Sequence, residues 1–186
     1  MRIKIIGAGL AASECAYALA RRGHSVDLHE MRPVKTTPAH ATSNLAELVC
    51  SNSFRSSNAT NAVGLLKQEM RLMGSMVIRC GEGARVPAGD AFAVARERFA
   101  AEVTKAIAST PNITLHREEI TTVDRGEHDF LVVATGPLTS DPLFPAIDDF
   151  LGRDGLYFYD AIAPIIAADS LDFSKLYWKS RYGKGS

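Results

Sequence analysis

The pattern of apolar and small residues over the first thirty positions predicts a strand, a tight turn, a helix and a second strand. Residues 3–6 form a short apolar run that leads into glycines at Gly7 and Gly9. Apolar positions at helical spacing then continue to Gly23, which is a natural helix stop, and residues 25–29 predict the second strand. This order is typical of an α/β domain with a parallel sheet.

The turn itself has the pattern Gly-x-Gly-x-x-Ala. Gly7 allows the reversal, Gly9 lets a phosphate approach the backbone, and Ala12 lets the helix pack close to the strand. The positive end of the helix dipole favours an anion such as the pyrophosphate of a dinucleotide. The candidate cofactor-binding residues of this stretch are Gly7, Ala8, Gly9, Leu10, Ala11 and Ala12.

Two residues at the end of the second predicted strand extend this site. Glu30 follows Gly9 at about the twenty-residue spacing of an acid that binds a ribose hydroxyl. Arg32 lies in the proline-containing loop over 31–40, where it can contact a phosphate or an adenosine. The alternatives are a packing loop of small residues, a surface Glu30 and a solvated Arg32.

A second informative stretch covers residues 129–137. Its continuous apolar run predicts a fully buried parallel strand beside the first one, with a small-residue exit at Ala134, Thr135 and Gly136. These three residues are therefore predicted to contact the same cofactor. A core strand that simply ends in a tight turn is the alternative.

The remaining elements follow from periodicity and turn residues. The apolar residues Val63, Leu66, Met70 and Met73 predict a helix whose stripe faces the core. The other expected segments are a polar loop over 51–58, a helix over 61–73, a strand over 76–79, a glycine-rich turn over 80–89, an amphipathic helix with an extended start over 90–109, strands over 112–116 and 119–123, and a connection over 141–154.

Composition restricts the class of protein. The 186 residues are 46% hydrophobic, with 21 basic and 21 acidic side chains, so the net charge of zero neither supports nor excludes an RNA partner. No run approaches the roughly twenty apolar residues of a membrane span, and no signal peptide is required to explain the apolar start. We therefore expect a soluble, cytoplasmic protein without a membrane association.

The cysteines and histidines give no metal or disulfide signal. Cys15, Cys50 and Cys80 are widely spaced, which fits the cytosol, and His116 and His128 lack partners at metal-ligand spacing. Cys50 stands where an apolar run gives way to a polar one. It is either a packed small side chain or a reactive thiol.

The end of the sequence is rich in aromatic residues. Residues 156–166 are aromatic and apolar, and residues 176–186 combine aromatic side chains with four cations. The latter composition suits stacking on bases or a flavin together with phosphate binding, and it also suits an unfinished domain.

Several blocks resemble the folate- and FAD-dependent tRNA (uracil-5-)-methyltransferases, the TrmFO family, and the resemblance spans essentially the whole chain. The blocks over 30–33 and 48–53 are the most specific, because the related GidA family of tRNA-modifying flavoproteins lacks them. The resembling blocks are residues 7–14, 30–33, 37–40, 46–53, 62–71, 86–89, 134–139 and 156–160.

This resemblance implies a Rossmann-like FAD-binding domain over 1–150 and the beginning of a tRNA- and folate-binding domain over 151–186. It further implies transfer of a one-carbon unit from methylenetetrahydrofolate, reduced through FAD with NAD(P)H, to C5 of a T-loop uridine in the T-arm of tRNA. Because C5 of uracil is a weak nucleophile, a thiolate adding to C6 or a flavin-borne carbon electrophile is required. Cys50 is implied to lie near the isoalloxazine as a catalytic residue.

Besides Ala12 at the third glycine position of the turn, which the pattern tolerates, two departures from the family are visible. Ala95 precedes Arg96 where the family carries an acid, and family members are far longer, with a second cysteine in their remaining part. We therefore expect a fragment or a truncated product. A generic GidA-like tRNA-modifying flavoprotein and a non-catalytic FAD-binding remnant remain as alternatives.

Overall fold

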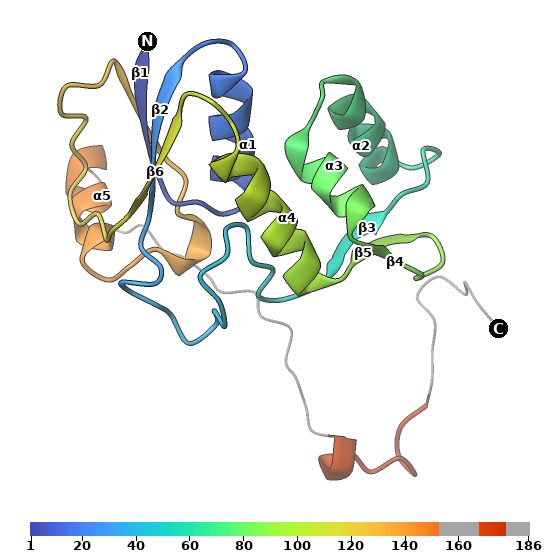
Figure 1. Ribbon diagram of the computed structural model, residues 1–186. Helices are drawn as coiled ribbons and strands as arrows, with labels where there is room; N and C mark the ends of the chain where they lie inside the picture. Colours follow the sequence, from blue (N-terminus) through green and yellow to red (C-terminus); the bar gives the residue numbers. More distant parts are fainter. Residues whose placement is uncertain (153–167, 178–186) are drawn as a thin grey trace.

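A four-stranded parallel sheet organises the protein (Figure 1). The computed structural model describes residues 1–152 and 168–177. The strands are paired in parallel in the order β6-β2-β1-β7. They comprise β1 (Arg2–Ile6), β2 (Ser25–Glu30), β6 (Ile113–Arg117) and β7 (Phe130–Val133). The predicted α/β fold with a parallel sheet is confirmed.

Two helices, α1 (Leu10–Ala20) and α4 (Arg96–Ala108), pack against this sheet. Ile5 and Leu28 are fully buried in the core that the sheet shares with these helices. Ala12 in α1 has none of its surface exposed, so the small side chain permits the close helix–strand approach that the sequence predicted. The amino terminus of α1 therefore lies at the carboxyl edge of the sheet.

A smaller antiparallel sheet follows β2 in the chain, and its strand order is β3-β5-β4. Its strands are β3 (Ser53–Ser56), β4 (Arg85–Val86) and β5 (Ala91–Val94), and its helices are α2 (Ala62–Leu72) and α3 (Met76–Gly83). Figure 1 shows this group beside α4 and α1, and α3 packs against both helices. Met76, Val94 and Phe99 share one hydrophobic cluster with Ile5 and Leu28, so the two sheets have a common core.

The prediction of a strand over 76–79 and a turn over 80–89 is wrong, because α3 and β4 occupy this segment. Ser75 caps the helix by accepting from the Ile78 N–H at 3.1 Å. Glu14 of α1 accepts from the Val77 N–H at 2.7 Å and from the Ser75 hydroxyl at 2.9 Å. A short apolar run does not distinguish a strand from a buried helix, and the acidic cap from α1 favours the helix here.

Three further secondary-structure predictions are wrong. The polar loop over 51–58 contains β3, whose Ser53 pairs with Ala93, and no strand forms over 119–123. The connection over 141–154 contains α5 (Leu143–Leu151), which ends at Gly152 with φ 60°. The short 3-10 helices η1 (Gly136–Leu138) and η2 (Ala168–Ser170) complete the described elements.

Two predictions of burial are also wrong. Leu66 and Met73 of the expected core stripe in α2 are 54% and 80% exposed, whereas Gly64 and Lys67 are the buried residues of that helix. β7 does pair with β1, as predicted, but Phe130 is 56% exposed because β7 stands last in the order of the described strands. The predictions for 156–166 and for 178–186 fall outside the described residues.

Candidate functional site

The turn between β1 and α1 is shaped by the approach of the end of β7. Gly7 has φ 94°, and a Cβ atom there would lie 2.8 Å from the Ala134 carbonyl oxygen and 2.9 Å from the Thr135 Cα. Only glycine fits both the backbone conformation and this distance. The two stretches that the sequence singled out separately, 7–12 and 134–136, therefore meet.

Hydrogen bonds fix the turn from two sides. The Gly7 N–H donates to the His29 carbonyl at 2.8 Å, and the Ala8 N–H donates to Oε2 of Glu30 at 3.1 Å. The Ala8 carbonyl accepts from the Ala46 N–H at 2.9 Å. The turn is thus held between the end of β2 and the loop that follows it.

The first turn of α1 presents unneutralised positive charge. Its N-cap residue, Gly9, has an ordinary φ of −71° and offers no side-chain acceptor, and the first turn contains no acidic residue. A Cβ atom at Gly9 would meet no described atom within 4 Å, so open space lies in front of the helix. A helix terminus with free amides and open space is suited to an anion, above all a phosphate.

A pocket of about 300 Å³ lies at this terminus, at the carboxyl edge of the sheet. All predicted cofactor-binding residues except Ala12 line it, namely Gly7, Ala8, Gly9, Leu10, Ala11, Glu30, Arg32, Ala134, Thr135 and Gly136. Ala12 is buried behind the pocket, between α1 and the sheet. Cys50 is exposed and is not part of the lining, although its neighbour Val49 is.

Glu30 and Arg32 form a buried ion pair, so the alternatives of a surface Glu30 and a solvated Arg32 are wrong. Nε of Arg32 donates to Oε1 of Glu30 at 2.7 Å, and Nη1 of Arg32 donates to Oε2 of Glu47 at 3.0 Å. Burial opposes ionisation of Glu30, but the hydrogen bonds and charge of Arg32 outweigh it, so the pKa of Glu30 lies below its ordinary value. Glu30 is therefore an ionised acceptor in the pocket wall.

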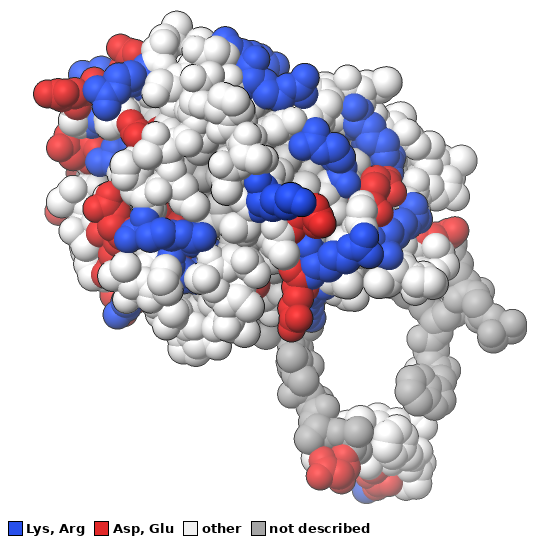
Figure 2. Space-filling model, in the orientation of Figure 1, with Lys and Arg blue, Asp and Glu red and all other residues white. Residues whose placement is uncertain are grey.

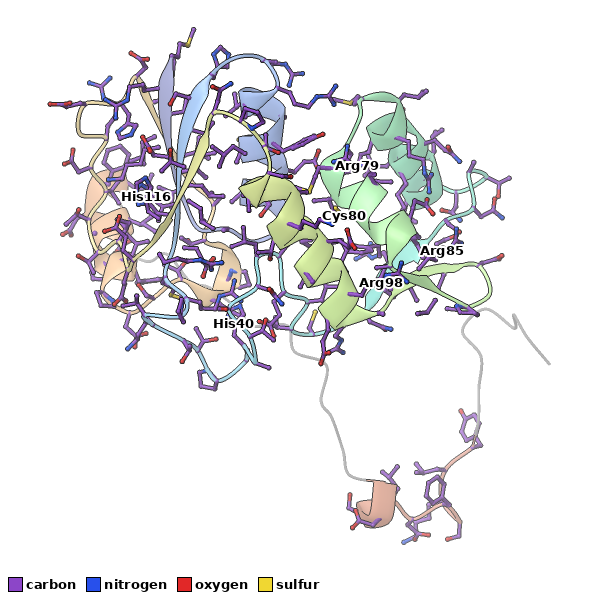
Figure 3. All side chains as sticks on the ribbon, viewed as in Figure 1. His40, Arg79, Cys80, Arg85, Arg98 and His116 are labelled. Atoms are coloured by element: carbon purple, nitrogen blue, oxygen red, sulfur yellow. The ribbon has the colours of Figure 1, made fainter. Side chains whose placement is uncertain are left out.

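The pocket also contains residues that were not among the predicted cofactor contacts, from the loop after β2, from the chain after β6 and from the chain after β7. His40 lies in the first of these loops (Figure 3), and its Nδ1 is 2.8 Å from the Thr37 hydroxyl. Burial and the nearby charge of Arg32 lower the pKa of His40, which favours the neutral ring. The additional lining residues are Met31, His40, Glu47, Val49, Glu118, Glu119, Ile120, Pro137, Leu138, Thr139, Ser140 and Leu143.

Among the lining residues that were not predicted, those after β6 could have been predicted from the sequence. A loop at the carboxyl end of a parallel strand approaches a ligand at this edge, but the false strand over 119–123 concealed the loop. Oε1 of Glu119 is buried there without a hydrogen-bond partner among the described residues.

Three histidines outside the pocket, His29, His116 and His128, take part in a polar cluster around Asp27 of β2. Asp27 accepts from Nε2 of His116 at 2.9 Å and from Nε2 of His128 at 2.7 Å. His116, labelled in Figure 3, stacks on His29 with ring centroids 4.7 Å apart. The part of the chain described by the structure contains no group of side chains arranged to hold a metal ion.

No helix within 1–152 or 168–177 is sufficiently long and apolar to cross a membrane. The three cysteines are free thiols.

Comparison with known proteins shows close relatives among longer bacterial enzymes. A Bacillus cytotoxicus protein named methylenetetrahydrofolate–tRNA-(uracil-5-)-methyltransferase TrmFO is 55% identical over 98% of this chain, and a Bacillus cereus protein of the same name is 54% identical over 98%. The chain spans 42% of the length of each.

Solved structures resemble the fold more distantly. Glycine oxidase from Geobacillus kaustophilus is 15% identical, with a TM-score of 0.47 over 82% of this chain and 59% of that one. A GidA-related protein from Thermus thermophilus is 17% identical, with a TM-score of 0.41 over 73% of this chain and 52% of that one.

The family model described as glucose inhibited division protein A matches residues 2–186, which is nearly the whole sequence. The chain therefore belongs to the glucose inhibited division protein A family.

Proposed function

We propose that this chain is the FAD-binding part of a folate-dependent tRNA (uracil-5-)-methyltransferase. The observation that carries the proposal is the 55% identity to a protein of that name over 98% of the chain. The matched region covers 98% of the chain and so includes the turn at Gly7, the loop after β2 and the Cys50 block. The activity belongs to the full-length enzyme, because the chain spans 42% of the relative.

The pocket residues fit the adenosine diphosphate half of FAD. The open space at Gly9 and the free amides of α1 suit the pyrophosphate. Oε2 of Glu30 accepts one hydrogen bond, from Ala8, so a lone pair remains for a ribose hydroxyl. The remaining contacts in the proposal are Leu10, Ala11, Arg32, Ala134, Thr135 and Gly136, with Ala12 supporting α1 from behind.

When bound, FAD supplies the redox chemistry that converts a transferred one-carbon unit into a methyl group. The chain's own residues bind and orient it: the α1 amides hold the phosphates, and Glu30 holds the ribose. Cys50 follows Val49 of the pocket wall and is exposed, which makes its thiol accessible to a substrate. We assign Cys50 the catalytic thiol role, with methylenetetrahydrofolate as carbon source and NAD(P)H as reductant.

The partner in this proposal is the T-arm of tRNA. On the face drawn in Figure 2, Lys and Arg side chains lie among Asp and Glu side chains. Binding of tRNA would therefore depend on local contacts and on the remainder of the full-length enzyme rather than on net charge. A tRNA-modifying role and the free thiols support a cytoplasmic location. We retain residues 1–150 as the FAD domain and 151–186 as the start of the tRNA- and folate-binding domain.

A GidA-like tRNA-modifying flavoprotein is the second candidate, and the family model over residues 2–186 favours it. Both candidates bind FAD at the same place. They differ in the reaction and in the position modified on tRNA.

A chimera tests the proposal. The matched region of the Bacillus cytotoxicus relative is replaced by this chain, and methyl transfer from labelled methylenetetrahydrofolate to tRNA is measured. We expect label at C5 of the T-loop uridine, and none in a matched chimera with Gly9→Val. Label elsewhere in tRNA would favour the GidA-like candidate. A wild-type chain that stays colourless and gains no thermal stability with FAD would indicate a non-catalytic remnant.

A further inference from the structure

Arg32 lines the pocket, yet its guanidinium forms ion pairs with two carboxylates of the protein. Only 2% of its surface is exposed. Its Nε donates to Glu30 at 2.7 Å and its Nη1 to Glu47 at 3.0 Å. Charge-assisted hydrogen bonds of this length are strong, so two carboxylates compete with any ligand phosphate for this guanidinium.

Glu47 is itself held firmly. Its Oε1 accepts from the Ala41 N–H at 2.9 Å, and its Oε2 accepts from the N–H and hydroxyl of Thr42 at 3.2 and 3.0 Å. Burial opposes its ionisation, but the hydrogen bonds from Ala41 and Thr42 prevail and lower the pKa of Glu47. A fixed carboxylate therefore holds Nη1 of Arg32, while Glu30 holds its Nε.

Arg117 strengthens the same arrangement from β6. Its Nη1 donates to the backbone carbonyls of Arg32 at 3.0 Å and of Ser43 at 2.8 Å. These two bonds tie the segment after β2 to the sheet at Arg32 and at Ser43. The guanidinium of Arg117 is thereby directed to backbone oxygens of the loop, and Arg117 does not line the pocket.

The charges of the pocket wall determine what the ion pairs of Arg32 with Glu30 and Glu47 mean for ligand binding. The carboxylates of Glu30, Glu47, Glu118 and Glu119 line the pocket together with the single guanidinium of Arg32. A phosphate beside Glu30 would meet negative charge, because Arg32 is already neutralised. A ribose hydroxyl there can donate to Glu30. The positive end of the pocket is the α1 terminus, where Gly9 leaves open space.

We infer that Glu47 is a specificity-determining, positioning residue: by holding Arg32 against Glu30, it makes the pocket accept a ribose with a free 2′-hydroxyl and reject a ribose that carries a 2′-phosphate. The inference rests on the proposed dinucleotide site. It adds Glu47, which sets the selectivity of the site through Arg32.

The test compares two probes, ADP-ribose and 2′-phospho-ADP-ribose, by calorimetry on the full 186-residue chain. The wild type is expected to bind ADP-ribose at least about tenfold more tightly. Glu47→Gln keeps the side-chain length but removes the negative charge that holds Nη1 of Arg32. In this variant the preference should fall by about tenfold or more, mainly through a gain for the phosphorylated probe.

Two further variants separate selectivity from folding. Adding Arg32→Gln to Glu47→Gln should abolish the gain for 2′-phospho-ADP-ribose, because the freed guanidinium causes it. Glu69→Gln, at an exposed position of α2 outside the pocket, should leave the ratio of the two affinities unchanged. A general loss of structure would weaken both probes together.

The outcomes distinguish the inference from the function on which it rests. If the wild type binds FAD but binds the two probes with equal affinity, the proposed role of Glu47 is wrong. This result does not depend on whether Glu47→Gln folds. A folded Glu47→Gln protein with the wild-type ratio also overturns that role. A wild type that binds neither FAD nor ADP-ribose refutes the proposed site as a whole.

Discussion

The Ala8 N–H donates to Oε2 of Glu30 at 3.1 Å, which joins the turn after β1 to the last residue of β2. The same carboxylate binds Arg32 through its other oxygen. One side chain thus orders the phosphate-facing turn and the loop after β2. The remaining hydrogen-bonding capacity of Glu30 is directed to the pocket that both elements line.

Replacing Glu30 by glutamine tests this relationship. The glutamine amide is uncharged and has one acceptor oxygen, so it cannot accept from both Ala8 and Arg32. We expect FAD affinity to fall by about tenfold or more, equivalent to ~1.5–3 kcal/mol for a hydrogen bond to a charged group. Flavin fluorescence titration measures the affinity. Unchanged affinity would show that Glu30 does not contact the cofactor.

The close approach of β7 to the turn predicts a stability effect at Gly7. In Gly7→Ala the new Cβ would lie 2.8 Å from the Ala134 carbonyl oxygen, at a φ of 94°. We expect a loss of ~2–4 kcal/mol in the free energy of unfolding, measured with urea. Gly126→Ala is the matched control, because Gly126 also has a positive φ, 56°, but open space around it. Equal losses at both positions would rule out the contact with β7 as the cause.

The elements of this site could be predicted from sequence where pattern and position coincide. The sequence patterns of β1, β2 and β7 indicate parallel strands, although β7 is less buried than its apolar run predicts, and Gly7 with Gly9 marks the turn between β1 and α1. The predicted cofactor residues depend on these local signals. They line one pocket because parallel strands bring their carboxyl ends to the same edge.

Other features depend on partners distant in the sequence. Glu47 forms an ion pair with Arg32 across a loop without periodicity, and nothing local marks that pairing. Likewise, α3 is stabilised by Glu14 of α1, 61 to 63 positions away. Proline at positions 142 and 145 concealed α5, although proline is tolerated in the first turn of a helix.

The lowered pKa of His29 predicts that the protein loses stability in mild acid. This pKa is lowered by burial, which outweighs the hydrogen bond to Glu118, so the folded state disfavours the protonated ring. The unfolded state therefore binds more protons. Stability should decrease as pH falls through about 6.5, the ordinary value, towards the lower folded pKa. The lowered pKa of Asp27 acts only below its ordinary value of 3.8, outside this window.

Urea unfolding between pH 7.5 and 5.5 measures this dependence. His29→Gln should flatten it in part, since His40 also has a lowered pKa and contributes with the same sign. The variant pair His29→Gln and His40→Gln separates the two contributions. A wild type whose stability rises towards pH 5.5 would contradict both assignments.

The exposed thiol of Cys50 gives a prediction about chemistry. In the chimera with the Bacillus cytotoxicus relative, Cys50→Ser should lower methyl transfer by more than about a thousandfold, as expected on removing a reacting nucleophile. FAD content should stay unchanged, because Cys50 does not line the pocket. Cys15→Ser, in α1, is the control for loss of a thiol. Full activity of the Cys50 variant would remove it from the mechanism.

The central claim is that the first turn of α1 holds the phosphates of FAD. Calorimetric titration of FAD into the 186-residue chain and into its Gly9→Val variant tests it most directly. A Cβ atom at position 9 meets no described atom within 4 Å, so the variant should keep its fold while the valine fills the phosphate space. We predict FAD binding by the wild type and none by folded Gly9→Val. Equal FAD binding by both proteins would contradict the account.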